Sequence, residues 1–216
     1  MHAMTVCLCA PLLLAVTAFG DASPDAQAPA RQPAPAATSE DPRRDMISAL
    51  PAPGPHPLLG DQARVFDRFV GTWDCDYSFI AADGTVRHSP GELRFGWIID
   101  GRALQDIWIG YPRRPDDERT IGTSVRFFDR ELKAWRVVFV APAFGAITVV
   151  QGGAEGDRIV LRGEDSDGSS LRWSFNDVKA DSFVWRGERS RDGGKTWKLE
   201  EEHHMTRRPM RDAGHS

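Results

Sequence analysis

The stretch 69-FVGTWDCDYSFI-80 decides the fold class of this chain, because its apolar residues change periodicity at the glycine. Residues 61–70 carry apolar side chains at helical spacing, and a glycine directly after them is suited to ending a helix. From Thr72 onward, apolar and polar residues alternate, as in a β-strand with one buried face. The side chains that share the apolar face are Trp73, Cys75, Tyr77 and Phe79. The sequence therefore predicts a short helix that leads directly into a first strand.

Segments with the same alternation follow as far as residue 207, and most are joined by turns rich in Gly and Asp. The predicted strands are residues 72–80, 93–99, 102–111, 121–128, 134–140, 146–151, 158–163, 171–176, 182–189 and 196–207. No helices alternate with them, which argues against a parallel sheet. Hairpin connections between nearly all of these strands favour an up-and-down barrel over a sandwich. The predicted fold is all-β: an antiparallel barrel of about ten strands with a short N-terminal helix.

Composition divides the chain into four parts. Residues 1–20 contain an uncharged apolar run that is too short to span a bilayer and is followed by small residues, as in a signal peptide. Residues 21–60 are rich in Ala and Pro, so we expect a disordered linker there. The barrel domain takes up residues 61–208, and residues 209–216 are expected to form a disordered tail. We therefore expect a periplasmic or secreted protein with no stable membrane insertion after signal cleavage.

The charge and the cysteines exclude several classes of function. A formal net charge of -4 argues against a nucleic-acid-binding protein. Two of the three cysteines lie in the predicted signal peptide, which leaves Cys75 without a partner for a disulfide. The chain has no phosphate-binding loop, no G-x-S-x-G, no H-E-x-x-H and no C-x-x-C. We predict no cofactor and no metal site, and the sequence leaves the oligomeric state open.

The junction of helix and first strand carries a known signature. Gly71-Thr72-Trp73 resembles the G-x-W pattern that opens the barrels of the calycin superfamily, which includes lipocalins, fatty-acid-binding proteins and avidin-like proteins. The resemblance implies that Trp73 closes one barrel end, with a basic residue of the last strand across it, and Arg207 is the natural partner.

A longer resemblance covers residues 69–208. Through the opening segment and through residues 97–102 and 190–197, the chain is similar to a set of uncharacterised secreted bacterial lipocalin-like domains. This resemblance implies a calycin-like barrel and carries no settled chemistry.

The segment 190-SRDGGKTW-197 matches the S-x-D-x-G-x-T-W pattern, the Asp box familiar from sialidases. In such a turn, Asp192 accepts hydrogen bonds from backbone amides and the glycines supply positive φ angles. Sialidases carry several such boxes and an arginine cluster on a much longer chain. We therefore interpret this segment as a structural hairpin turn, with Asp192 as its central residue.

Ionisable residues cluster in 200-EEEHH-204 on the last predicted strand. Alternation sends Glu201 and His203 to the face of Trp197 and Met205, and it sends Glu200 to the opposite face. If the first face is the lumen, the Glu–His pair is suited to binding a polar ligand group or to acid–base chemistry. The alternatives are a buried pair that only satisfies its own hydrogen bonds, or a pair at a solvated barrel mouth. One His and one Glu fall short of the three protein ligands of a catalytic zinc site.

The same alternation predicts which side chains line the barrel. The candidate ligand-binding residues are Tyr77, Trp97, Trp135, Trp173, Trp185, Glu201 and His203. This many indoles either form a cup for a ligand or fill the barrel as a packed core.

Three functions are compatible with these patterns. The leading hypothesis is an exported barrel that binds a small apolar or aromatic ligand without catalysis. The first alternative is a barrel enzyme, an isomerase, cyclase or hydrolase, that uses Glu201 and His203. The second is a structural accessory protein of the cell envelope. A related family of small barrels holds haem through a C-terminal histidine, for which His203 or His204 would be the analogue, but the rest of that pattern is absent here.

Overall fold

The computed structural model describes residues 42–209 except Arg113 and Pro115. The predicted signal peptide, the first part of the predicted linker and nearly all of the predicted tail lie outside these residues. Within the described part of the chain, no helix is long and apolar enough to cross a bilayer.

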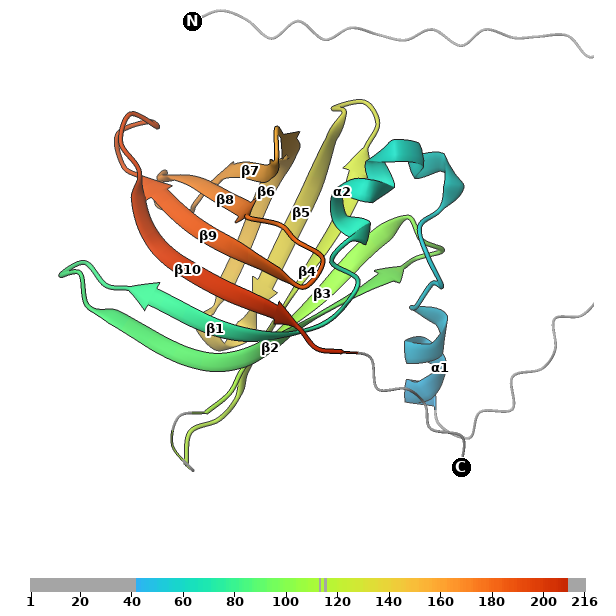
Figure 1. Ribbon diagram of the computed structural model, residues 1–216, viewed down its shortest axis with the longest axis horizontal. Coiled ribbons are helices and arrows are strands. Elements are labelled where there is room, and N and C mark those ends of the chain that lie inside the picture. Colours follow the sequence, from blue (N-terminus) through green and yellow to red (C-terminus); the bar gives the residue numbers. More distant parts are fainter. Residues whose placement is uncertain (1–41, 113, 115, 210–216) are drawn as a thin grey trace, which may run out of the picture. The chain divides into compact units, whose positions relative to one another are not determined.

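The predicted barrel is confirmed. Ten antiparallel strands close into one sheet in the order β1-β10-β9-β8-β7-β6-β5-β4-β3-β2, so consecutive strands are neighbours and the last strand pairs with the first (Figure 1). The strands are β1 (Gly71–Ile80), β2 (Val86–Ile98), β3 (Ala103–Gly110), β4 (Thr120–Asp129), β5 (Ala134–Ala141), β6 (Ala146–Glu155), β7 (Arg158–Glu164), β8 (Ser170–Asn176), β9 (Ser182–Ser190) and β10 (Lys198–Arg207). The helical elements are α1 (Pro42–Ala49), η1 (Pro57–Gln62), α2 (Ala63–Asp67) and η2 (Pro142–Phe144).

The structure differs from the expected linker in residues 42–60. This segment contains α1, and its chain then pairs with the hairpin between β2 and β3. The amide of Ala52 donates to the carbonyl of Trp97 at 2.8 Å, and the amide of His56 donates to the carbonyl of Gly101 at 2.9 Å. Proline has no backbone N–H, so a proline-rich segment cannot form a continuous ladder of hydrogen bonds with a strand. This segment instead pairs with the β2–β3 hairpin through isolated backbone hydrogen bonds.

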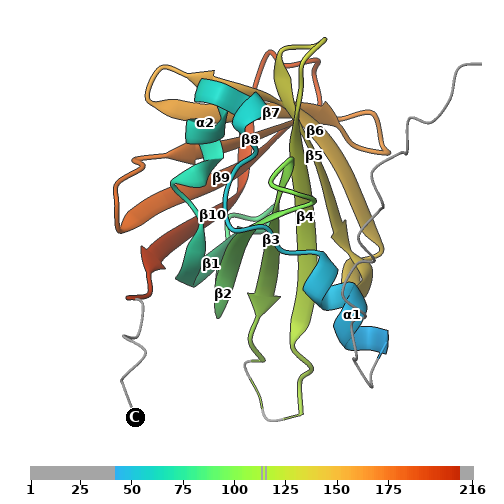
Figure 2. The ribbon, with the colours of Figure 1, turned by 90° about the vertical axis from the view of Figure 1, so that its right-hand side faces the viewer.

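The helical segment before β1 closes one end of the barrel, as Figure 2 shows for α2. Phe66 and Phe69 are completely buried, and the Phe66 ring packs edge-on to Trp135 at a centroid distance of 5.0 Å. The indole nitrogen of Trp73 donates to the carbonyl of Phe69 at 2.7 Å. The Arg207 guanidinium lies 4.0 Å from the centre of the Trp73 ring, as the calycin resemblance implies. This end of the barrel is therefore filled by aromatic side chains.

The turn between β9 and β10 shows why the Asp-box residues occur together. Asp192 accepts hydrogen bonds from the amides of Lys195 and Thr196 at 3.0 and 2.9 Å, and from the Ser190 hydroxyl at 2.7 Å. Gly193 has a φ of 72°, in the left-handed region that favours glycine. All five residues that define the pattern, Ser190, Asp192, Gly194, Thr196 and Trp197, form hydrogen bonds within the turn, and none of them lines the barrel cavity.

We expect the Asp192 carboxyl to titrate at about pH 2, because hydrogen bonds from Thr196 and Ser190 stabilise its charged form. Its pKa is lower in the folded chain than in the unfolded chain, so its contribution to stability is present above the ordinary carboxyl pKa and is lost as the pH falls toward 2. A ¹³C NMR titration of the carboxyl measures this pKa directly. Thr196→Val should raise it, and an unchanged value would contradict the assigned cause.

Candidate functional site

A cavity of about 460 Å³ occupies the barrel interior beyond the aromatic plug, the name used below for the buried side chains of Phe66, Phe69, Trp73 and Trp135 at the closed end. All ten strands contribute to its wall, together with Phe144 of η2. Its size falls in the range of pockets that hold small organic molecules, roughly 300–1,000 Å³. The largest aromatic side chains in its wall are Tyr77, Trp108, Trp173 and Trp185. The barrel is therefore partly hollow: its aromatic side chains fill one end as a packed core and line a cavity in the remainder.

Five of the seven predicted ligand-binding residues line this cavity: Tyr77, Trp173, Trp185, Glu201 and His203. The other two, Trp97 and Trp135, do not line it. Trp135 is completely buried against Phe66 of the plug, and the indole nitrogen of Trp97 donates to Asp67 at 2.8 Å. Both face inward, but they lie at the closed end, because alternation fixes the face of a strand and not the depth along the barrel axis.

His203 is held in the cavity wall by aromatic rings on several sides. Its ring stacks on Trp185 at a centroid distance of 4.9 Å and an interplanar angle of 11°. Tyr77 meets the same ring edge-on, also at 4.9 Å. The His203 Nε2–H donates to Glu201 Oε2 at 3.0 Å, since an ionised carboxylate can only accept. Nδ1 is buried and has no hydrogen-bond partner among the described residues. The pair thus points a single free imidazole nitrogen into an aromatic environment.

A β-bulge changes the faces of the acidic run on β10. The register of β10 against β9 shifts between Leu199 and Glu201. Such a bulge breaks the strict alternation locally, so Glu200 lines the cavity together with Glu201. The prediction that Glu200 faces away from the cavity was therefore wrong.

Sequence reasoning missed a buried ion pair at the inner end of the cavity. Arg126 on β4 donates through Nη2 to Asp106 Oδ2 on β3, and the two side chains are only 4% and 6% exposed. Ser124 stands directly across from Asp106 in the β3–β4 ladder, and all three residues line the cavity. The sequence does contain an indication of this pair: each of two neighbouring strands carries a charged residue at a position whose side chain alternation directs inward.

Burial governs the protonation of these groups. Desolvation raises the pKa of Asp106 above its usual range even though Arg126 and Ser124 act in the opposite direction. Desolvation likewise lowers the pKa of Arg126, although Asp106 opposes this. The pKa of the Cys75 thiol is raised by burial, so this cysteine is a protonated core residue and not a nucleophile.

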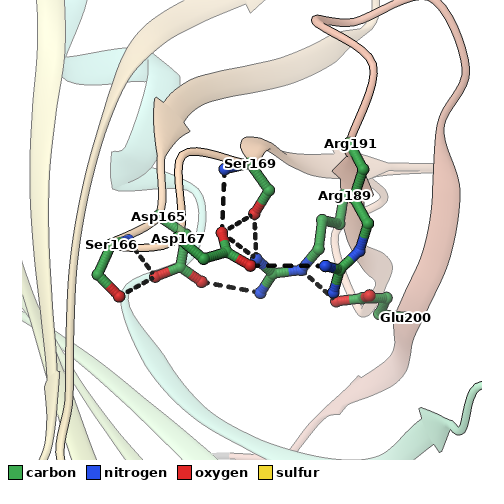
Figure 3. A network of polar contacts seen from close by, with 7 residues as sticks. All are labelled: Asp165, Ser166, Asp167, Ser169, Arg189, Arg191 and Glu200. Atoms are coloured by element: carbon green, nitrogen blue, oxygen red, sulfur yellow. Dashed lines mark hydrogen bonds and ion pairs between the residues drawn. The ribbon is translucent and has the colours of Figure 1, made fainter.

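Ion pairs fix the wall around the mouth of the cavity (Figure 3). Arg189 of β9 binds Glu200 of β10 at 2.9 Å and Asp165, at the turn between β7 and β8, at 2.8 Å. The hydrogen bond from Arg189 is the main cause of the lowered pKa of Asp165. One guanidinium therefore ties three neighbouring segments of the rim together.

Within the described residues, no group of three or more His, Cys, Asp or Glu side chains is placed to hold a metal ion.

Fold and cavity together define a closed, calycin-like antiparallel barrel. No protein-family model matches the chain, and no curated protein matches it. Among solved structures, the S-type phycobiliprotein lyase CPES from Guillardia theta is similar, with 12% identity, 68% of this chain and 93% of that chain covered, and a TM-score of 0.52. Rv2717c from M. tuberculosis is similar with 13% identity, 72% and 99% coverage and a TM-score of 0.51. At these identities the likeness establishes the fold alone.

Proposed function

We propose that this protein is an exported binding protein that takes a small, largely aromatic molecule into its barrel. The observation that carries the proposal is the cavity of about 460 Å³ with walls of Trp, Tyr and Phe side chains. Aromatic walls stack favourably on flat ligands and bury much apolar surface. Polar side chains in the same wall, among them Arg126 and His203, would fix the orientation of the ligand.

An exposed aromatic side chain stands at the edge of the cavity. Phe144 of η2 is 63% exposed, yet it lines the cavity and lies 6.1 Å from the ring of Trp108. An exposed phenyl ring at the edge of a cavity gains buried surface when a ligand enters beside it.

Native mass spectrometry of the protein purified from the envelope of its own host tests the proposal. We expect a population with a bound small molecule, released on denaturation and absent from the denatured spectrum of the chain. Repeatedly empty spectra, together with no binding of uncharged aromatic probes, would overturn the proposal.

Filling part of the cavity should weaken binding. Thr148 of β6 lines the cavity, whereas its neighbour Val149 points outward and is 47% exposed. We expect Thr148→Trp to weaken binding of the uncharged fluorescent probe N-phenyl-1-naphthylamine by about tenfold or more, since the indole takes up ligand space. Val149→Trp adds the same indole to the same strand on the outer face and should leave the affinity unchanged. Equal effects of the two variants would place the probe elsewhere.

A barrel enzyme is the second candidate, and the contact between Glu201 and His203 favours it. A carboxylate that orients an imidazole in the wall of a pocket is a common acid–base arrangement. Turnover of a co-purified ligand by the wild type, with loss in Glu201→Gln, would support catalysis over simple binding. Release of the ligand unchanged after prolonged incubation would count against it.

A further inference from the structure

The pair of Asp106 and Arg126 is an unusual component of an aromatic cavity. A buried ion pair is often no more stabilising than apolar side chains of the same size, so its presence calls for a role other than stability. The Arg126 guanidinium lies between two rings, with its central carbon 5.0 Å from the centroids of Phe66 and Phe95. Its position is therefore fixed before any ligand enters.

Arg126 retains donors that the protein does not use. Nη2 donates to Asp106, whereas Nε and Nη1 are buried and have no acceptor among the described residues. Buried donors in folded proteins nearly always find an acceptor, and leaving one unpaired is costly. An acceptor supplied from the cavity, which Arg126 lines, would satisfy them.

The charge of the Asp106–Arg126 pair determines which kind of hydrogen-bond acceptor a ligand can place beside it. Asp106 already balances the guanidinium, so the pair is neutral as a unit. A ligand carboxylate would add a second negative charge beside Asp106 in a buried, poorly solvated place, which is unfavourable. A ketone, ester or amide oxygen accepts the same hydrogen bonds without that charge.

We propose that the buried end of the ligand carries a neutral carbonyl group, which accepts a hydrogen bond from the Arg126 guanidinium, while its aromatic part stacks on the cavity wall. This inference rests on the proposed binding function and specifies the ligand class. Arg126 and Asp106 then determine which class of ligand binds, although neither residue belongs to a recognisable sequence motif.

Three probes of nearly equal shape test it: 2-acetylnaphthalene, its alkene isostere 2-isopropenylnaphthalene, and the anion 2-naphthoate. Calorimetric titration gives the ratio of the dissociation constants of alkene and ketone. In Asp106→Leu/Arg126→Met, which removes both charges at once, we expect the preference for the ketone to fall about tenfold relative to the wild type. The control Glu155→Leu/Arg162→Met removes an exposed ion pair between β6 and β7 and should leave the ratio unchanged.

The outcomes separate the two proposals. Binding of both uncharged probes with the same ratio in wild type and double variant overturns the carbonyl inference and leaves the binding function standing. Tighter binding of 2-naphthoate than of the ketone overturns the choice of a neutral group. Failure of all three probes to bind the wild type removes the binding function and this inference together.

A second measurement needs no variant. The infrared carbonyl stretch of ¹³C-labelled 2-acetylnaphthalene bound to the wild type should lie below its frequency in hexane, because a hydrogen bond weakens the C=O bond. A bound band at the hexane frequency overturns the inference even if the double variant does not fold.

Discussion

Arg126→Met alone is expected to lower the free energy of unfolding by about 3–5 kcal/mol, because it leaves the Asp106 carboxylate buried without its counter-ion. Both side chains are almost fully enclosed, so solvent cannot take over the role of the guanidinium. Urea unfolding followed by tryptophan fluorescence measures the change. In Asp106→Leu/Arg126→Met, where no charge remains, most of the loss should be recovered. A double variant as unstable as the single one would show that packing by Arg126, and not its charge, is what matters.

The same variant should acquire a characteristic pH dependence. Burial already raises the pKa of Asp106 in the presence of Arg126, and removal of the guanidinium raises it further. A carboxyl with a raised pKa in the folded state binds its proton more tightly there than in the unfolded chain. Its contribution to stability is therefore present at low pH and is lost as the pH rises through the folded-state pKa. Arg126→Met should accordingly be more stable relative to the wild type at acidic pH than at neutral pH.

Trp73→Ala is expected to cost about 3–5 kcal/mol, the usual range for removal of a large, fully buried aromatic side chain. The indole is completely buried, packs edge-on to Phe183 at 4.7 Å and ties the segment of Phe69 to β1 through its N–H. The variant leaves a cavity under Arg207 and loosens the plug. Equilibrium unfolding in urea provides the measurement.

Trp73→Phe is the matched control, since it keeps an aromatic ring and removes the N–H donor. We expect it to lose clearly less stability than Trp73→Ala. A loss below about 1 kcal/mol for Trp73→Ala would contradict the view that the G-x-W tryptophan closes the barrel, because full burial predicts several times more.

The barrel was predictable from the sequence because its determinants are local. Alternation over five to ten residues and the turns between strands fix strand number and direction, and the G-x-W signature leads to the contact of Trp73 with Arg207. The depth of Trp97 and Trp135 was not predictable, because alternation fixes only their inward phase while their depth depends on how far each strand is staggered along the axis. The pair of Asp106 and Arg126 is visible only once β3 and β4 are aligned, since Arg126 stands across from Leu104 in that ladder.

The bulge on β10 illustrates a second limit. One extra residue between Leu199 and Glu201 brings Glu200 to the cavity, and nothing in the run of three glutamates indicates where the register slips. Segment 42–60 shows a third limit: its composition is that of a linker, and its backbone contacts with the β2–β3 hairpin depend on tertiary structure.

The closure of the sheet between β1 and β10 affects how the chain folds during synthesis. Trp73 pairs with Arg207 across almost the whole length of the domain, so the outer edges of the growing sheet stay unpaired until the last ten-residue strand has been synthesised. Pairing segments that are this far apart in the sequence costs more loop-closure entropy than forming a hairpin, so it is slower. The barrel of the nascent chain therefore remains open until β10 has been synthesised. Until then β1 and β9 are unpaired sheet edges, and such edges make an incompletely folded β-protein prone to aggregation.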